Sequence, residues 1–387
     1  MNELYANWNY PNSIRAGAGR IEELPSICQQ LGMKAPLLIT DPGLSSLPMV
    51  KNVVAACRKA GLTCGLFSEI QANPTGQNVG DGVVAYRAGN HDGVIAFGGG
   101  SALDAAKAVA LMVGQVRPLW DFEDVNDNWT RVNEAGIAPV VAVPTTAGTG
   151  SEVGRASVIT DSDNHIKRII FHPNMLPSVV ILDPELTCGL PAHITAATGM
   201  DALSHNLEAI CSPYYHPMAE GIAVEGIRLV KNYLPRAVAD GSDLEARTQM
   251  LVASTMGATA FQKGLGGMHA LAHPLGALYN AHHGLLNAIL MPYILKANRY
   301  AIAARIERLA RYLNLTNPSF DGFLSWVLTL REQLSIPHTL AVINIDESAA
   351  DQVGRMAAED PSAGGNPISF EALEYARIFK NAVNGRL

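Results

Sequence analysis

The sequence predicts a two-domain protein in which an α/β half precedes an all-helical half. In residues 1–186, short apolar runs alternate with helical stretches, whereas in residues 187–387 β-branched runs are rare and Ala, Leu and Met recur at helical spacing. Continuous apolar runs separated by helices are typical of a parallel sheet that is buried on both faces. A chain of 387 residues, 48% of them hydrophobic, is long enough to form a packed core in each half.

The expected elements follow from these patterns and from the Gly, Pro, Asn and Asp residues that punctuate them. The first half should contain strands over residues 36–40, 63–67, 93–97, 139–143 and 179–182, and helices over 49–60 and 79–89. The second half should contain helices over 191–210, 217–233, 243–262, 301–313, 319–334, 347–358 and 369–384. The change of pattern near residue 187 marks the expected domain boundary.

Composition excludes several classes of partner. The net charge is −7, from 28 basic and 35 acidic residues, and no basic cluster stands out, so we expect no nucleic-acid partner. No apolar run approaches the roughly 20 residues that span a bilayer, so we expect no membrane partner, and Met1–Tyr5 lacks the pattern of a signal peptide. The five cysteines are scattered and form no C-x-x-C pair, as expected for reduced thiols in the cytoplasm.

Two pairs of polar residues at helical spacing predict a metal site in the second half. Asp201 and His205 are four residues apart, as are His269 and His273, so each pair projects from one face of a helix. Four of the eleven histidines lie between His269 and His283, in a segment that is otherwise almost without charge. Polar nitrogens in such surroundings need partners, and a metal ion between two packed helices would provide one. The alternative is a set of histidines that are only hydrogen-bonded in the core or at the surface.

Two stretches of small residues in the first half predict a phosphate-binding edge of the sheet. Gly98–Ser101 lies between an expected strand and an expected helix, where glycines allow close approach and a helix N-terminus offers free N–H groups to a phosphate. Ser101 and Asp104 have the spacing of a capping box. Pro144–Glu152 brings hydroxyls and glycines just past the end of a strand, where ligands bind in open α/β sheets. Each stretch is also consistent with an ordinary tight turn, and the usual G-x-G-x-x-G fingerprint is absent.

These motifs resemble those of a known family. Gly-x-x-His-x-x-x-His-Pro-x-Gly from Gly266, with His-Gly ten residues after the second His, resembles the signature of the iron-containing (group III) alcohol dehydrogenases. Gly98–Lys107 resembles the pyrophosphate loop of that family, and Thr145–Glu152 resembles its cofactor-binding stretch. The resemblance covers nearly the whole chain. It implies a dehydroquinate synthase-like fold, in which an α/β N-terminal dinucleotide-binding domain and an all-α metal-binding domain enclose the active site in the cleft between them.

The resemblance assigns the metal site residue by residue. The ligands carried over are Asp201, His205, His269 and His283, and the metal is Fe2+, although these ligands also suit Zn2+ or another divalent ion. His273 is then a catalytic residue that relays a proton beside the nicotinamide, or a residue that only packs there. The family usually has Pro before the last ligand, where this chain has His282. Both His282 and His283 are therefore candidates, and we favour His283 because it keeps the spacing and precedes Gly284.

The resemblance also assigns the cofactor contacts and identifies the cofactor as NAD. The positions carried over are Asp41, Asn73, Gly99, Gly100, Ser101, Asp104, Thr145, Thr146, Thr149 and Lys167. Asp41 follows the first strong strand, where a carboxylate can accept hydrogen bonds from both ribose hydroxyls and would repel a 2′-phosphate. In the family an acid at this position favours NAD over NADP. Without the resemblance, Asp41 is also consistent with an ordinary turn residue before Pro-Gly.

The function that the resemblance implies is that of an iron-type NAD-dependent dehydrogenase. It would interconvert a small primary alcohol and its aldehyde, or a hydroxy acid and its semialdehyde, with the metal polarising the carbonyl and the nicotinamide carrying the hydride. Arg155, in the stretch that lines the family's substrate pocket, would pair with an anionic substrate or instead face an interface or the other domain. We expect a homodimer or higher homo-oligomer. The alternatives are a glycerol-dehydrogenase-like polyol dehydrogenase and a non-catalytic protein that binds NAD or metal.

Overall fold

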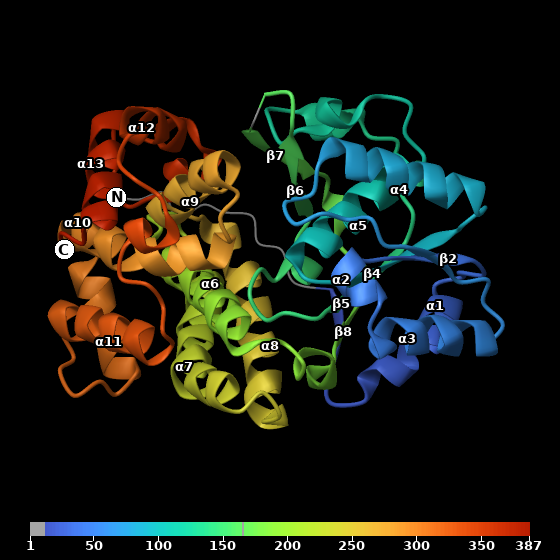
Figure 1. Ribbon diagram of the computed structural model, residues 1–387, viewed down its shortest axis with the longest axis horizontal. Helices are drawn as coiled ribbons and strands as arrows, with labels where there is room; N and C mark the ends of the chain where they lie inside the picture. The colour runs from blue at the N-terminus through green and yellow to red at the C-terminus, as the bar shows by residue number, and fades with distance from the viewer. Residues whose placement is uncertain (1–11, 165) are drawn as a thin grey trace. The chain divides into compact units, whose positions relative to one another are not determined.

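The computed structural model describes residues 12–164 and 166–387, which form two compact units, residues 12–189 and 190–387 (Figure 1). The first unit is α/β and the second is helical, and the division between them falls close to the predicted boundary after residue 186. The segment considered above for a signal peptide lies outside the described residues. Among the described helices, none combines the length and the apolar character that crossing a bilayer requires.

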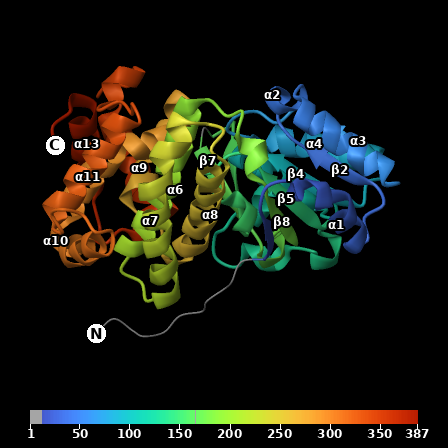
Figure 2. The same cartoon turned by 90° about the horizontal axis from the view of Figure 1, so that it is seen from below.

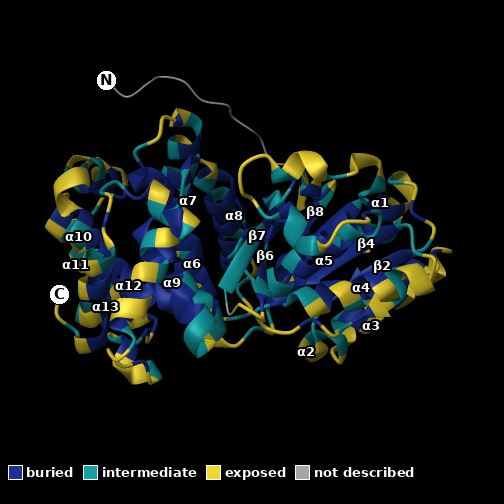
Figure 3. Ribbon diagram, turned by 90° about the horizontal axis from the view of Figure 1, so that it is seen from above, coloured by how far each residue is buried: buried dark blue, intermediate teal, exposed yellow. Residues whose placement is uncertain are grey.

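The first unit is built on a six-stranded sheet in which every neighbouring pair of strands is parallel. Its strands are β1 (Ser13–Ala16), β2 (Pro36–Ile39), β3 (Gly65–Phe67), β4 (Gly93–Gly98), β5 (Val140–Pro144) and β8 (Val179–Leu182). They lie in the order β1-β8-β5-β4-β2-β3. Every residue of β4 and β5 is buried, which explains their continuous apolar sequences and confirms the predicted α/β fold with a parallel sheet. Figure 3 shows β4 in the dark blue of buried residues.

Helices cover both faces of this sheet (Figure 1). They are α1 (Leu24–Gln30), the short α2 (Pro42–Ser45), α3 (Pro48–Lys59), α4 (Gly76–Ala88) and α5 (Gly100–Met112). Side chains of α1 and α3 share one core with alternate residues of the central strands, such as Ile95 and Val141. Helix α5 packs on β4 and β5 from the other side, with α4 beside it.

Three strands of the first unit were not predicted from the sequence. The edge strand β1 is short and mostly exposed, so it has no apolar run to indicate it. Strands β6 (Ala156–Asp161) and β7 (Ile166–Phe171) form a separate antiparallel pair. Strand β6 alternates buried and partly buried residues, which is the pattern of a sheet with one covered face, so it contains no continuous apolar run that would indicate a strand.

The second unit contains eight α-helices among its described residues, together with short 3-10 turns. The helices are α6 (Ala192–Cys211), α7 (Pro217–Ala239), α8 (Leu244–Ala260), α9 (Gly267–Tyr279), α10 (His283–Tyr312), α11 (Phe320–Gln333), α12 (Ala350–Glu359) and α13 (Ala372–Asn384). Helix α6 is buried along nearly its whole length. Helices α7, α8 and α10 pack against it, and Figure 2 shows α7 and α8 beside it. The central position of α6 matters because it carries the first predicted pair, Asp201 and His205.

Helix α10 begins well before the predicted start at residue 301. The stretch Leu286–Leu295 is buried all round and contains Pro292, so it lacks the one-sided apolar pattern of a surface helix. The helix instead continues through the proline, back to His283. The result is that His283 occupies the first turn of a long, buried helix rather than a loop.

Gly284 sets how closely α10 approaches α6. A Cβ atom at this position would lie 2.5 Å from the carbonyl oxygen of Ala197 and 3.0 Å from the Cβ of Asp201. Backbone carbonyls cannot rotate away, so only glycine allows the two helices to meet here. The glycine that follows His283 is therefore required by packing beside a candidate ligand.

We predict that Gly284→Ala lowers the free energy of unfolding by about 1–3 kcal/mol because it overpacks this contact. Gly221 in α7 is the matched control, since a Cβ there meets nothing within 4 Å. Gly221→Ala should raise stability by about 0.5–1 kcal/mol through helix propensity. Urea unfolding followed by circular dichroism measures both, and equal shifts in the same direction would contradict the packing argument.

Candidate metal centre and cofactor loops

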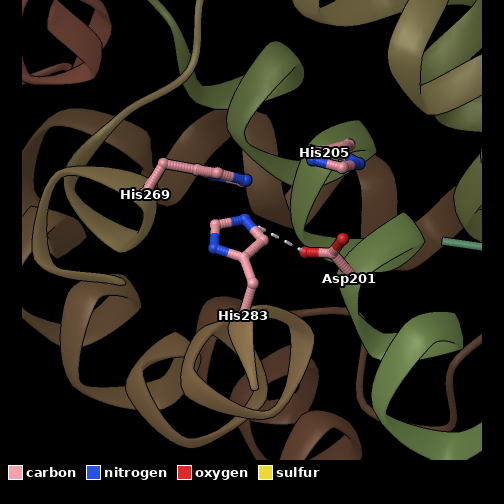
Figure 4. Close-up of side chains that lie close together, drawn as sticks. All are labelled: Asp201, His205, His269 and His283. Carbon is pink, nitrogen blue, oxygen red and sulfur yellow. Dashed lines mark ion pairs between the residues drawn. The ribbon is translucent and has the colours of Figure 1, made fainter. Parts of the chain in front are cut away.

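Four side chains from three helices of the second unit converge on one point (Figure 4). Asp201 and His205 project from α6, His269 comes from α9 and His283 from the first turn of α10. One donor atom from each residue lies within 4.8 Å of all the others. Asp201, His205 and His269 are buried, whereas the side chain of His283 is 25% exposed. The cluster is therefore buried except at the His283 side chain, where it is partly exposed to solvent.

The donor set has the chemistry of a divalent metal site. The His205 and His269 rings stack with centroids 4.8 Å apart, and the His269 and His283 rings lie 5.2 Å apart. Asp201 Oδ1 is 3.8 Å from His283 Nε2. Three imidazoles and a carboxylate that converge in this way suit zinc, iron or another divalent ion. The residues present therefore fit the metal that the motif implies.

The structure brings His283, and not His282, into this cluster. The His282 side chain caps the N-terminus of α10, where its Nδ1 accepts a hydrogen bond from the backbone N–H of Leu285 at 3.3 Å. Capping satisfies one of the free N–H groups at a helix start. His282 therefore has a local structural role at the position where the family usually has proline.

Glu208 holds His269 in place, and the sequence analysis missed it. Its Oε2 lies 2.6 Å from His269 Nδ1, and its carboxylate also accepts from the backbone N–H groups of Gly266 (2.8 Å) and Met268 (2.7 Å). Burial lowers the pKa of His269, but the carboxylate of Glu208 outweighs burial and raises it overall. This contact places the ring proton on Nδ1 and leaves the Nε2 lone pair facing the cluster. The available signal was spacing, because Glu208 follows His205 by three residues on α6.

His273 borders the cluster and is held by Asp360. Its ring stacks on His283 at 5.4 Å with an interplanar angle of 13°. Its Nδ1 lies 2.8 Å from Asp360 Oδ2, while Ser362 donates its backbone N–H to Asp360 Oδ1 at 2.8 Å. Burial raises the pKa of Asp360, but the His273 imidazole and the hydrogen bonds from Ser362 lower it overall. Asp360 was missed because it lies 87 residues from His273 in the sequence.

The glycine-rich turn of the first unit opens α5 without a side-chain cap. Gly99 is the N-cap residue and the helix begins at Gly100, so the predicted capping box of Ser101 and Asp104 is wrong. Ser101 is the second residue of the helix, two positions after the N-cap, so it cannot cap it. Asp104 instead accepts hydrogen bonds from Ser151 Oγ (2.5 Å) and from the backbone N–H of Val158 (3.0 Å). The helix N-terminus keeps free N–H groups of the kind that bind phosphate.

The threonine-rich stretch packs directly on this turn. A Cβ on Gly100 would lie 2.5 Å from Thr149 Cγ2, and one on Gly99 would lie 3.4 Å from Thr146 Oγ1. The backbone N–H of Thr145 donates to the carbonyl oxygen of Gly98 at 2.9 Å. Glycines and hydroxyls from two distant segments therefore form one small-residue cradle at the carboxyl ends of β4 and β5, which fits a dinucleotide pyrophosphate.

Lys107 holds the cradle from behind. It is fully buried, and its Nζ donates to the carbonyl oxygens of Ser151 (2.9 Å) and Ala156. Its ion pair with Asp104 spans 3.3 Å. Burial lowers the pKa of Lys107 overall, although Asp104 opposes this shift. Lys107 and Asp104 therefore position the loop that carries Thr149. The Lys107 Nζ and the Asp104 carboxylate are engaged in these contacts rather than turned to a ligand.

The remaining sequence candidates of the first unit lie near this cradle or pair with each other. Asp41 accepts from the backbone N–H of Leu44 at 3.0 Å, and its Oδ2 would be 3.7 Å from a Cβ on Gly98. Lys167 donates to Asn73 Oδ1 at 2.9 Å. The Arg155 guanidinium lies over the Phe171 ring at 5.5 Å. Asp41 is thus placed beside the glycine turn, as a ribose-binding acid would be.

Comparison with known proteins identifies the chain. Residues 11–184 match the family model described as iron-containing alcohol dehydrogenase, and residues 195–383 match the C-terminal model of the same family. The chain is 36% identical over 384 residues to 4-hydroxybutyrate dehydrogenase of Cupriavidus necator, covering 97% of this chain and 99% of that enzyme. It is 34% identical to NAD-dependent methanol dehydrogenase of Bacillus methanolicus, covering 97% and 100%. The crystal structure of a 1,3-propanediol oxidoreductase superimposes with a TM-score of 0.92 at 35% identity, covering 97% and 100%.

The fold and the site, together with these matches, define a dehydrogenase, an oxidoreductase that acts on alcohols. The chain belongs to the iron-containing alcohol dehydrogenase family. The predicted family, fold class and type of reaction are thereby confirmed.

We predict that Glu208→Gln weakens metal binding about 10- to 100-fold, because an amide cannot anchor His269 as a carboxylate does. Affinity for Zn2+ is measured by competition with a chromophoric chelator. Glu225→Gln, which removes a partly exposed carboxylate paired with Arg228 on α7, is the control and should leave the affinity unchanged. An unaltered affinity in Glu208→Gln would show that His269 needs no such anchor.

Proposed function

We propose that this protein is a metal- and NAD-dependent dehydrogenase that interconverts a small primary alcohol and its aldehyde, or a hydroxy acid and its semialdehyde. The observation that carries the proposal is the convergence of Asp201, His205, His269 and His283 within 4.8 Å. We assign Fe2+ as the metal from the family, with Zn2+ as the alternative that the same ligands would accept. The NAD-dependent methanol dehydrogenase of Bacillus methanolicus supports the choice of cofactor.

The metal and the cofactor each supply one part of the chemistry. A divalent cation bound by these four side chains would polarise the substrate oxygen as a Lewis acid, and NAD would accept or donate the hydride. The chain's own residues hold and orient both groups. Glu208 keeps the Nε2 lone pair of His269 directed at the cluster. The free N–H groups at the start of α5, with Gly99, Gly100, Ser101, Thr145, Thr146 and Thr149, would hold the pyrophosphate and its neighbours.

His273 is the residue that we propose moves the proton. Its ring lies against His283 at the exposed side of the cluster, and its Nδ1 is engaged by Asp360. The proton on Nδ1 is then fixed, so Nε2 is the atom that accepts a proton from the alcohol or returns it to the aldehyde oxygen. Asp360 stabilises the imidazolium that forms when Nε2 is protonated, as a buried carboxylate does for a catalytic histidine.

Asp41 would select NAD over NADP. One of its oxygens caps α2, and the other lies beside the glycine turn that would hold the pyrophosphate. A carboxylate there can accept from the ribose hydroxyls but repels a 2′-phosphate. Asn73 and Lys167, already joined by a hydrogen bond, would contact the cofactor as a pair. Asp104 would act on the cofactor through Ser151 rather than by touching it.

The experiment that tests this function starts from metal-depleted protein reloaded anaerobically with Fe2+ or Zn2+. Oxidation of NADH is followed with ethanal, propanal, 3-hydroxypropanal and succinic semialdehyde. We expect oxidation that depends on the added metal, and a preference for NADH over NADPH of at least about tenfold, or ~1.4 kcal/mol. The function would be contradicted if folded, metal-loaded protein failed to oxidise NADH with any of the four aldehydes. A preference for NADPH would contradict only the role of Asp41.

Arg155 is the proposed determinant for an anionic substrate. The 4-hydroxybutyrate dehydrogenase of Cupriavidus necator is named for a substrate with a carboxylate, which supports this assignment. Arg155 is half-buried, and its guanidinium rests on Phe171, an arrangement that holds the charged group in a defined direction. A charge-assisted hydrogen bond from it would add about 1.5–3 kcal/mol to the binding of a carboxylate.

We predict that Arg155→Ala lowers kcat/KM for succinic semialdehyde by about 10- to 100-fold, since each tenfold step corresponds to ~1.4 kcal/mol. The value for propanal should stay within about twofold, as expected when the lost interaction involves only the substrate carboxylate. Arg155→Lys keeps the charge and should retain part of the activity on the acid. Equal losses on the neutral and the acidic aldehyde would remove Arg155 from substrate recognition.

We also propose that the protein is a cytoplasmic homo-oligomer. The five scattered cysteines, which form no C-x-x-C pair, support a reducing compartment.

A further inference from the structure

Asn287 contacts the candidate metal ligands of all three helices. It lies one turn after His283 on α10 and is completely buried. Its side-chain nitrogen Nδ2 lies 2.8 Å from Asp201 Oδ1, 3.2 Å from His269 Nε2 and 3.2 Å from His283 Nε2. These three atoms are the ones that a metal would use. No motif in the sequence singled out this residue.

The neighbours of Asn287 decide which end of its amide group faces the cluster. The carboxylate oxygen of Asp201 is an acceptor, and His269 Nε2 is one too because Glu208 holds the ring proton on Nδ1. An amide oxygen pointed at these atoms would place acceptors against each other, so the NH2 group faces them. Two hydrogens serve three acceptors, and the shortest contact is with Asp201. One hydrogen is therefore committed to Asp201, and the other is shared by the two imidazoles.

The other end of the amide shows that Asn287 is not kept for packing. Its Oδ1 is buried and has no hydrogen-bond partner among the described residues. An unsatisfied buried acceptor costs stability, whereas a leucine would fill a similar space without that cost. The gain that offsets the cost lies at the NH2 end, where the partners are the candidate ligands.

We propose that Asn287 is a positioning residue that holds Asp201, His269 and His283 ready for a metal ion. This inference rests on the metal centre of the proposed function. Each imidazole Nε2 has one lone pair, which can accept from Asn287 or bind a metal but not both. Asp201 Oδ1 has two, so it could bind a metal and still accept from Asn287. Asn287 thus satisfies the imidazoles when no metal is bound and orients the carboxylate in both states.

The test compares two buried asparagines on the same helix. Asn287→Leu removes the NH2 group at the cluster, whereas Asn298→Leu removes a buried amide that is paired with Asn366 at 2.9 Å. Affinity for Zn2+ is measured by competition with a chromophoric chelator, and the half-time of Zn2+ loss to excess chelator is recorded. Circular dichroism checks folding. If either leucine variant fails to fold, the pair Asn287→Ala and Asn298→Ala is compared in the same way.

We expect Asn287→Leu to bind Zn2+ about 10- to 100-fold more weakly and to lose it faster. Asn298→Leu should stay within about twofold of the wild type, because the Asn298 amide is paired with Asn366 and not with a candidate metal ligand. Equal affinity in Asn287→Leu and wild type, or an equal loss in both variants, would overturn the role of Asn287 while leaving the metal centre intact. Wild-type protein that binds no Zn2+ would instead overturn the metal centre and the proposed function.

Discussion

The close approach of helices α6, α9 and α10 is the constraint on which the candidate metal centre depends. Four donor atoms can lie within 4.8 Å of one another only if the helices that carry them nearly touch. Gly284 permits that contact on one side, because any side chain would strike the Ala197 carbonyl. Glu208 enforces it on the other, because its carboxylate joins α6 to the first turn of α9 through two backbone N–H groups and His269.

This arrangement concentrates negative charge in a buried place. Asp201 and Glu208 are both buried, and a carboxylate removed from water needs strong partners. Glu208 has such partners in His269 Nδ1 and in the backbone N–H groups of Gly266 and Met268. Asp201 has the Asn287 amide at 2.8 Å and the His283 ring at 3.8 Å. A divalent cation among the imidazoles would neutralise the buried negative charge of Asp201. For this reason the cluster fits a metal better than a purely structural histidine network.

The sequence predicted those features that depend on local pattern. Fully buried strands such as β4 and β5 appear as continuous apolar runs, and the pairs Asp201/His205 and His269/His273 appear through helical spacing. The start of α10 was not predicted, because Leu286–Leu295 is buried on every side and has no polar face to mark the helical period. Strand β6 of the antiparallel pair alternates in burial and therefore contains no continuous apolar run.

The supporting residues of the site were harder to predict because their roles arise from tertiary contacts. Asp360 meets His273 across 87 residues, and Asn287 meets Asp201 across 86. Glu208 had a usable signal in its position one turn after His205. The capping box at Ser101 failed for a local reason, since the helix begins two residues earlier than the motif requires and Asp104 is engaged by Ser151.

Anomalous X-ray scattering from metal-loaded crystals, recorded at the absorption edge of the metal, tests the central claim most directly. The account predicts a single strong peak at bonding distance, about 2.0–2.2 Å, from one donor atom each of Asp201, His205, His269 and His283. A peak bonded to other side chains, or no peak in crystals of protein that has taken up one metal per chain, would contradict it.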